Sequence, residues 1–291
     1  LIKNADIAMY RAKDAGKNTY QFYSADMSAR AFERLTLDSS LRHAIERNEF
    51  RLYYQPQIDT ASGAVLGVEA LLRWQHPDFG LVAPAEFIPL LEETGLIVPV
   101  GEWVFHTACE QLCAWHAAGW PTLRMAVNLS PRQFQGTGLA MMVERGLAAV
   151  GCDPGLIELE ITENVLLRHA ATTLDALDAL RALGVRLAID DFGTGYSSLS
   201  YLRRYSIDTL KVDRSFVHDV PGDADDCALA TAIIVLAQSL KLDVIAEGVE
   251  TEAQRDFLQE RGCQVMQGYL FSRPVPAEEI PHLLEIHNPK S

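Results

Sequence analysis

Residues 157–191 have the sequence IELEITENVLLRHAATTLDALDALRALGVRLAIDD, from which the fold class follows. A β-rich run, Ile157–Thr162, precedes a helical pattern over Asn164–Leu183, and Gly184 stands where a C′ glycine ends a helix. A second β-rich run, Val185–Asp190, follows directly. Strands that alternate with helices form parallel βα units. This stretch therefore predicts an α/β fold with a parallel sheet.

The same alternation continues over the chain from about residue 50. The strand candidates are Arg51–Ile58, Val65–Trp74, Arg124–Leu129, Ile157–Thr162, Val185–Asp190, Thr209–Asp213, Asp243–Glu247 and Val265–Leu270. Further helical patterns cover Val100–Ala118, Asp225–Leu240 and Thr251–Arg261, and Gly119 and Gly262 stand at helix ends. Eight such units over about 240 residues predict a TIM-type (β/α)8 barrel. Because only DTASGA joins the first two strands, a hairpin is expected there, with the first strand antiparallel to the second.

Two segments precede the barrel. Residues 1–24 contain one helical pattern and a short β-rich tail, which cannot bury themselves, and residues 25–48 form a helical pattern that suits a connecting helix. The barrel domain is expected over residues 49–291. Because the chain begins at Leu1 within a helical pattern and without an initiator Met, we expect it to be a piece of a longer protein.

Composition excludes several classes of protein. The 291 residues are 48% apolar and 22% charged, which is ordinary for a globular protein and excludes disordered and low-complexity chains. The formal charge of −14 disfavours a nucleic-acid polymer as partner, although a small anionic ligand in a locally cationic cleft is compatible with it.

The longest apolar run, residues 228–236, is too short to cross a bilayer, so no membrane segment is expected in this chain. Five cysteines without a CxxC pair indicate neither a disulfide framework nor a zinc site, and a reducing cytoplasm fits best.

Polar side chains stand at the C-terminal ends of successive strand candidates. In a barrel of this kind, functional groups gather at those ends because the following loops converge there. The residues so placed are Glu69, Asn128, Glu160, Asp190, Asp191, Lys211, Asp213, Glu247 and Gln267. Carboxylates that meet in one cavity repel one another and resist desolvation, so a cation is expected among them. Oxygen ligands without His or Cys favour Mg²⁺ or Mn²⁺, and the adjacent Asp190 and Asp191 suit two ions, a known device for phosphodiester cleavage.

Structural explanations exist for several of these positions. Gln55 also suits a half-buried polar residue of the first strand, and Arg73 suits an ion pair with Glu69. Glu163 also suits a cap at the start of the helix after the fourth strand. The DDFGTG turn at residues 190–195 is by itself a common sequence after a strand. Cys109 and Cys113, one helical turn apart, fit core packing.

The ordered motifs resemble the EAL-type cyclic di-GMP phosphodiesterases from about Phe50 to Glu285. The motif that names the family is Glu69-Ala70-Leu71, within YYQPQI and GVEALLRWQHP, and the further blocks are PAEFIPLLEETGLI, NLSPRQF, ELEITE, DDFGTGYSSLSYL, LKVDRSF, AEGVETEAQ and QGYLFSRP. The N-terminal ADIAMYRAKDAGKN is similar to the tail of a GGDEF-type diguanylate cyclase domain, whose signature loop is missing from this chain. The resemblance implies upstream GGDEF and sensory domains in the parent protein, and it is compatible with a membrane anchor outside this fragment.

The resemblance also implies a reaction and a set of roles. One metal is implied at Glu69, Asn128, Glu160 and Asp190, and a second at Asp190, Asp191 and Glu247. Lys211 is implied to position or polarise the attacking water, with Gln267 forming a hydrogen bond near the same site. Gln55 and Arg73 are implied to contact the substrate backbone and phosphate. Asp213 and Glu250 are implied to lie near a guanine. Glu163 anchors the loop Asp191–Leu202, which leads to a homodimer contact. The implied reaction hydrolyses cyclic di-GMP to linear pGpG.

Two rivals to this reading remain open. A catalytically silent cyclic di-GMP receptor is the first, although every expected metal ligand is present. A barrel enzyme of unrelated chemistry, such as an aldolase, fits the strand-end carboxylates but not the ordered motifs. One departure from the family is Ser206, where relatives often have Pro before Ile207-Asp208. Because Ser lacks the fixed φ of Pro, we expect a modest effect on turnover and none on metal binding.

Overall fold

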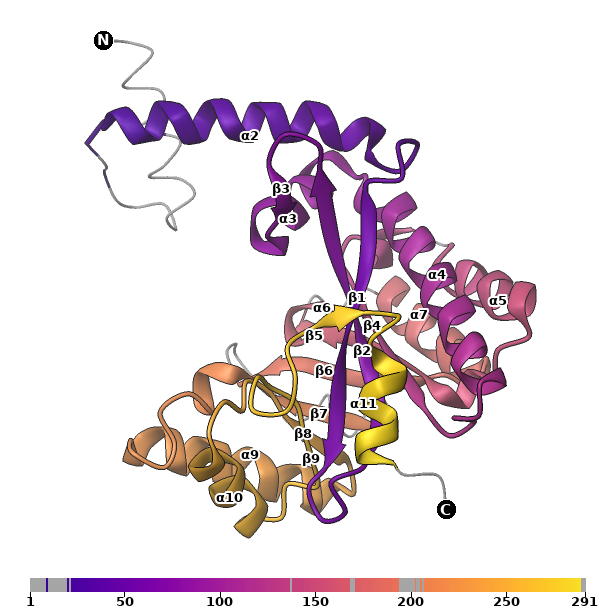
Figure 1. Cartoon of the computed structure of the whole chain (residues 1–291), viewed down its shortest axis with the longest axis vertical. Coiled ribbons are helices and arrows are strands. Elements are labelled where there is room, and N and C mark those ends of the chain that lie inside the picture. The colour runs from indigo at the N-terminus through magenta and orange to yellow at the C-terminus, as the bar shows by residue number, and fades with distance from the viewer. Residues whose placement is uncertain are drawn as a thin grey trace. The chain divides into compact units, whose positions relative to one another are not determined.

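Eight strands close into a barrel in the computed structural model, which describes residues 9, 20, 22–136, 138–167, 171–193, 202, 205 and 207–288 (Figure 1). In their order around the barrel these strands are β1 (Phe50–Asp59), β2 (Val65–His76), β4 (Arg124–Leu129), β5 (Ile157–Thr162), β6 (Arg186–Phe192), β7 (Thr209–Val212), β8 (Asp243–Ala246) and β9 (Val265–Met266). Neighbours from β2 to β9 are parallel, whereas β1 runs antiparallel to β9 and also pairs with β2. The predicted TIM-type barrel with an antiparallel first strand is confirmed.

The predicted helices after the strands are present, and α5 (Leu139–Val150) and α11 (Ile280–His287) are additional to them. The other helices of the barrel region are α4 (Ile97–Ala117), α6 (Glu163–Leu167), α7 (Ala171–Ala182), α9 (Ala224–Leu240) and α10 (Glu252–Glu260). Within the helix expected over residues 164–183, the structure describes α6 and α7, and residues 168–170 between them lie outside the described part. Left-handed glycines stand after the helices as expected, with φ of 109° at Gly119, 91° at Gly184 and 81° at Gly262.

The last barrel strand is shorter than predicted. β9 ends at Met266, not at residue 270, because the chain curls around the loop after β8. The Val249 amide donates to the Gln267 carbonyl, and the Leu270 amide donates to the Val249 carbonyl. A Cβ at Gly268 would lie 2.1 Å from the Val249 carbonyl oxygen, so this close approach requires glycine. A short strand, β10 (Val275–Pro276), then pairs antiparallel with β1.

The chain divides into two compact units, residues 1–51 with 73–96 and residues 52–72 with 97–291. The first unit holds α2 (Ala25–Ala44), β3 (Gly80–Val82) and α3 (Pro84–Thr94). Its core is aromatic, since Trp74 packs against Phe50 and Phe87, and the Trp74 indole donates to buried Glu49 at 3.0 Å. The Arg34 guanidinium joins α2 to α3 through Glu93 at 2.7 Å.

Some expectations lie outside the described residues. Most of the segment compared with a GGDEF tail, Ser206, and most of the loop Asp191–Leu202 belong to this group. The proposed division at residues 24 and 48 stays a prediction.

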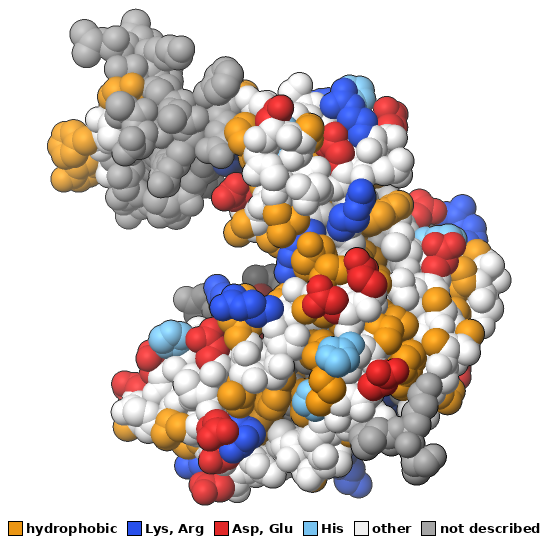
Figure 2. Space-filling view, in the orientation of Figure 1, with side chains coloured by type: hydrophobic (Ala, Val, Ile, Leu, Met, Phe, Trp, Pro, Cys, Tyr) orange, Lys and Arg blue, Asp and Glu red, His pale blue; other side chains and the backbone are white. Residues whose placement is uncertain are grey.

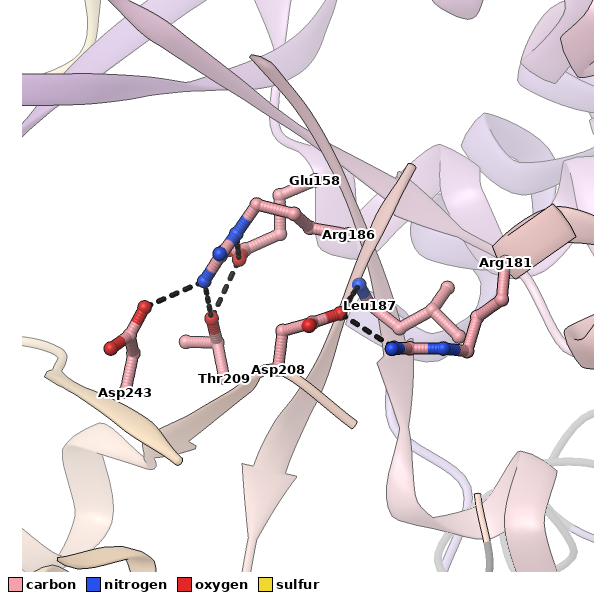
Figure 3. Close-up of polar contacts among 7 residues, drawn as sticks. All are labelled: Glu158, Arg181, Arg186, Leu187, Asp208, Thr209 and Asp243. Atoms are coloured by element: carbon pink, nitrogen blue, oxygen red, sulfur yellow. Dashed lines mark hydrogen bonds and ion pairs between the residues drawn. The ribbon is translucent and has the colours of Figure 1, made fainter. Parts of the chain in front are cut away.

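An ion-pair network ties together the N-terminal ends of four neighbouring barrel strands (Figure 3). Arg186 at the start of β6 contacts Glu158 on β5 at 3.2 Å and Asp243 on β8 at 2.6 Å. Its guanidinium also donates to the Thr209 hydroxyl on β7 at 3.2 Å, and that hydroxyl donates to Glu158 at 2.6 Å. This end of a barrel serves stability, because the loops that carry chemistry lie at the other end.

One face of the described part of the chain carries charges of both signs (Figure 2). On the face drawn in Figure 2, acidic and basic side chains are interspersed among apolar ones. Among the described helices, none combines the length and the apolar character that a bilayer span requires.

Candidate active site at the mouth of the barrel

A cleft of about 260 Å³ lies where the barrel strands end. It is lined by Gln55, Glu69, Leu71, Asp190, Arg214, Glu247, Gly248, Glu250, Gln267, Gly268 and Tyr269. Six strands or the segments after them supply its charged and amide groups, which are Gln55 on β1, Glu69 on β2, Asp190 on β6, Arg214 after β7, Glu247 and Glu250 after β8, and Gln267 after β9. The predicted convergence of strand-end residues is therefore present within the second unit.

Lys211 is at the centre of the charged groups. Its side chain is fully buried on β7, and Nζ lies 2.6 Å from Glu247 Oε1 and 2.7 Å from Glu160 Oε2. Asp190 Oδ1 is 3.3 Å from the same nitrogen, and Glu69 Oε2 is 3.8 Å away. The ammonium thus compensates part of the negative charge of four carboxylates from four strands. Burial favours the neutral amine, but these carboxylates outweigh it and raise the pKa of Lys211 well above its usual value.

A β-bulge brings two consecutive aspartates toward the same place. In a regular strand, neighbouring side chains point to opposite faces. The pairing of β6 with β7 shifts its register between Ile189 and Phe192, and Asp191 takes the left-handed conformation with φ of 53°. As a result, single carboxylate oxygens of Asp190, Asp191 and Glu247 lie within 4.8 Å of one another. The left-handed backbone conformation is strained for most residues. Glycine tolerates it best, and Asp and Asn come next.

Glu69 is held in place by two side-chain amides. Asn128 Nδ2 on β4 donates to Glu69 Oε1 at 2.6 Å, and Gln267 Nε2 donates to Glu69 Oε2 at 2.5 Å. Gln267 Nε2 also donates to Gln55 Oε1 at 3.0 Å, and Gln55 Nε2 donates to the Ser272 carbonyl at 3.0 Å. Gln55 is therefore a buried member of a network that reaches Glu69.

The shared cavity changes the acidity of its carboxyl groups. Burial, together with the charges of Asp190 and Glu69, raises the pKa of Glu247 to about 8 against the opposing effect of Lys211. Burial and the neighbouring Asp190 raise the pKa of Asp191 to about 6. Burial and Glu69 also raise the pKa of Glu160. Burial acts in the same direction on Glu69, but Lys211 and the two amide donors prevail and lower its pKa. The site therefore has more acidic groups than its one ammonium compensates.

The arrangement of these oxygens fits a divalent metal ion. Asp190, Asp191 and Glu247 offer three carboxylate oxygens in one small region without His or Cys, which is the ligand chemistry of Mg²⁺ and Mn²⁺. The raised pKa values of Asp191 and Glu247 indicate carboxyl groups that a bound cation would stabilise as carboxylates. The residues present thus fit a metal centre at the mouth of the barrel.

The remaining predicted site residues occupy several places. Glu250 lines the cleft, and its amide donates to Gln254 Oε1 at 2.7 Å. The Asp213 carboxylate accepts hydrogen bonds from the Ser215 amide and hydroxyl, so it caps the short helix that starts at Arg214. Arg73 belongs to the first unit, so its substrate contact stays a prediction.

Glu163 lies at the start of α6. Its carboxylate is buried, and Oε2 accepts a hydrogen bond from the Gly193 amide at 3.3 Å. Gly193 belongs to the loop after β6. The contact with Gly193 is compatible with Glu163 as an anchor of the loop after β6, and this anchoring role stays a prediction.

Sequence reasoning missed several residues of the cleft wall. Arg214 and Tyr269 line the cleft, and the Arg273 guanidinium lies 4.3 Å from the centre of the Tyr269 ring. A signal for Arg214 was available, because it directly follows the strand-end Asp213. Tyr269 could not be found in this way, because it enters the wall through the turn that replaces the predicted end of β9.

Comparisons with known proteins identify the family. The chain is 48% identical over 280 residues to the bifunctional diguanylate cyclase/cyclic di-GMP phosphodiesterase MucR of Pseudomonas aeruginosa, covering 96% of this chain and 41% of MucR. It is 44% identical over 287 residues to the cyclic di-GMP phosphodiesterase NbdA of the same organism, covering 99% of this chain and 37% of NbdA. The chain therefore spans about two fifths of the length of these curated relatives.

A solved structure gives the same result. The structure of the MucR phosphodiesterase in complex with c-di-GMP superposes with a TM-score of 0.82 at 47% identity, covering 84% of this chain and 99% of that chain. The family described as EAL domain matches residues 38–274. The chain belongs to the EAL domain family.

Proposed function

We propose that this chain hydrolyses cyclic di-GMP to linear pGpG with the help of divalent metal ions. The observation that carries the proposal is the convergence of Asp190, Asp191 and Glu247 beside the buried Lys211, in a family whose members MucR and NbdA are named cyclic di-GMP phosphodiesterases. We further propose that the bound ions are Mg²⁺ or Mn²⁺, two in each site.

Each group of side chains has a separate part in this proposal. Glu69, Asn128, Glu160 and Asp190 would hold one ion, and Asp190, Asp191 and Glu247 the second. When bound, such ions would polarise a phosphodiester and lower the pKa of a water molecule. Lys211 orients the attacking water through its ammonium, and Gln267 fixes the Glu69 carboxylate through the short amide contact. The attack forms one P–O bond with water and breaks one bridging P–O bond, which opens the cyclic dinucleotide.

The wider setting follows from the resemblance. We propose that the chain acts as a homodimer, that Glu163 couples the loop after β6 to the dimer contact, and that Gln55, Arg73, Asp213 and Glu250 contact the substrate. We also propose that the parent protein carries GGDEF and sensory domains upstream, and that this part functions in the cytoplasm.

One experiment tests the proposed reaction. The chain is incubated with cyclic di-GMP and Mg²⁺ or Mn²⁺, with and without EDTA, beside the variants Glu69→Ala and Glu252→Ala, and pGpG is measured by chromatography. We expect turnover that EDTA abolishes, a loss of at least ~100-fold in Glu69→Ala, and none in Glu252→Ala, which alters an α10 residue outside the cleft. Binding without turnover in either metal would instead support the receptor alternative, and neither binding nor turnover would refute both readings.

A further inference from the structure

Three cysteines gather on one side of the barrel, away from the cleft. Cys109 and Cys113 lie one turn apart on α4 and therefore on the same face of that helix. Cys152 follows α5, directly after its left-handed C-cap Gly151. The Cys152 sulfur hydrogen-bonds with the thiols of both Cys109 and Cys113. Three nucleophilic side chains from two elements thus meet at one point.

The backbone around this cluster is well fixed. α4 and α5 approach so closely that a Cβ at Gly146 would lie 2.7 Å from the Phe105 ring. The Cys152 amide donates to the Leu147 carbonyl at 3.1 Å, and the Cys113 sulfur lies 3.9 Å from the Val150 carbonyl oxygen. These contacts hold Cys113 beside the C-terminal end of α5, where Cys152 begins the next segment.

The three thiols differ in reactivity. Hydrogen bonds from Cys109 and Cys113 stabilise the thiolate of Cys152 and lower its pKa to about 7, although burial opposes this effect. Burial and the neighbouring Cys152 raise the pKa of Cys113 to about 11, and the hydrogen bond with Cys152, followed by burial, raises that of Cys109 further. Cys109 is fully buried, Cys152 is also buried with 7% of its surface exposed, and Cys113 is partly exposed. Cys152 is therefore the favoured first nucleophile, and Cys113 is the better placed of its two neighbours to react second.

We propose that Cys113 and Cys152 form a reversible disulfide when the protein meets hydrogen peroxide. The Cys152 thiolate attacks one peroxide oxygen, so that an S–O bond forms, the O–O bond breaks and hydroxide leaves as water after protonation. The Cys113 thiol then gives up its proton and its sulfur attacks Cys152, so that the S–S bond forms, the S–O bond breaks and a second water leaves. Two thiols are oxidised and one peroxide is reduced in this sequence.

The position of this bond predicts its effect. Cys152 precedes β5 at its N-terminal end, whereas the cleft lies at the opposite ends of the strands. The bond would close residues 113–152 into a loop that contains β4, with the cross-link itself at the N-terminal end of β5. We therefore expect the oxidised protein to melt at a higher temperature, because the cross-link restricts the unfolded chain, and to keep its hydrolytic rate.

Peptide mapping tests the proposal. The full chain is treated with hydrogen peroxide, quenched with iodoacetamide, digested and analysed by mass spectrometry, before and after dithiothreitol. We expect a cross-linked peptide pair containing Cys113 and Cys152, about 2 Da lighter than the two thiol peptides, which dithiothreitol separates. The pair is expected to persist in Cys227→Ser, a matched control on α9, and to be lost in Cys113→Ser.

A second readout keeps the test independent of any single variant. In Cys113→Ser, oxidation is expected to stop at a Cys152 sulfenic acid, which dimedone traps, and the melting curve shows whether the variant is folded. A Cys109–Cys152 cross-link, a cross-link between two chains, or direct conversion of wild-type Cys152 to sulfinic acid would overturn the assignment. These outcomes concern thiols alone, so they do not depend on the proposed hydrolysis.

Discussion

The ammonium of Lys211 has four carboxylates within 3.8 Å and no exposed surface. A buried cation in such a place is stable only because its partners are charged, and the same holds for each carboxylate in turn. Removing the ammonium therefore leaves acidic groups that must either take up protons or repel one another.

Replacing Lys211 with Met preserves most of the side-chain volume and removes the charge. We expect the metal-free protein to lose about 3 kcal/mol of unfolding free energy, because the buried carboxylates lose their cation. Urea denaturation in EDTA measures this loss, and saturating Mn²⁺ is expected to reduce it while turnover stays absent. The exposed Lys241→Met serves as control, with an expected change below about 0.5 kcal/mol. Equal stability of Lys211→Met and wild type would contradict the argument.

Arg214 is an exposed cation on the wall of an acidic cleft. A guanidinium there suits a phosphate or a guanine edge, each of which accepts two hydrogen bonds from its fork. We expect Arg214→Ala to raise KM about tenfold with a smaller change in kcat, since such a charge-assisted contact contributes about 1.5 kcal/mol. Steady-state kinetics on cyclic di-GMP checks this, with the exposed Arg145→Ala as control. A fall in kcat at constant KM would show that Arg214 does not contribute to substrate binding.

The sequence predicts which side chains meet at the site, but it does not predict the backbone conformation that brings them together. Strand ends and periodicity place Glu69, Asp190, Lys211 and Glu247 at one mouth, and the structure agrees. The left-handed Asp191 and the bulge beside it are not readable from the residues, because Asp–Asp after a strand is equally compatible with a regular turn. The amide contacts of Gln267 also depend on a curl of the chain that follows tertiary packing.

The elements of the barrel are secured at the end opposite the cleft. The Arg186 guanidinium contacts acidic groups on β5 and β8 and the hydroxyl on β7, so one side chain connects four strands (Figure 3). Glu158 is buried, and its carboxylate depends on Arg186 for charge compensation. The network is therefore expected to act on stability and not on chemistry.

Arg186→Met tests this separation. We expect a loss of about 3 kcal/mol in unfolding free energy, since the buried Glu158 loses its partner, and a fall of roughly 6 to 12 °C in Tm. Scanning calorimetry measures the fall in Tm. The kcat on cyclic di-GMP, measured well below the unfolding transition, is expected to stay unchanged. Arg145→Met, which removes an exposed pair with Glu102, is expected to leave Tm within about 2 °C of wild type. A lowered kcat in a fully folded Arg186→Met protein would show coupling between the two ends of the barrel.

Element types were predictable where the pattern is long, and element ends were predictable only for some elements. β4 and β5 have the predicted limits, and the glycines mark the ends of α4, α7 and α10. β3 and β10 escaped prediction because each has only two or three residues and exists through its neighbour, β2 or β1. β9 is shorter than its β-rich sequence suggests, since the packing of Gly268 against Val249 outweighs local propensity.

Metal binding is expected to stabilise the molecule as a whole. A ligand that binds only the folded state adds about 2.7 kcal/mol at one hundred times its dissociation constant. Saturating Mn²⁺ is therefore expected to raise Tm by about 5 to 10 °C, and EDTA is expected to reverse the shift. Differential scanning fluorimetry measures this effect without any substrate. Asp190→Asn, which removes a carboxylate central to both proposed ion sites, is expected to show a much smaller shift; an equal shift would place the ions elsewhere.

β1 pairs with β9 and β10, which lie more than 200 residues later in the sequence and are therefore synthesised much later. Until Met266 and Val275 have emerged during synthesis, β1 and β8 each present an open strand edge. Such edges are available to strands of other chains. Truncation before residue 265 is thus expected to yield a product that aggregates, not a smaller working barrel.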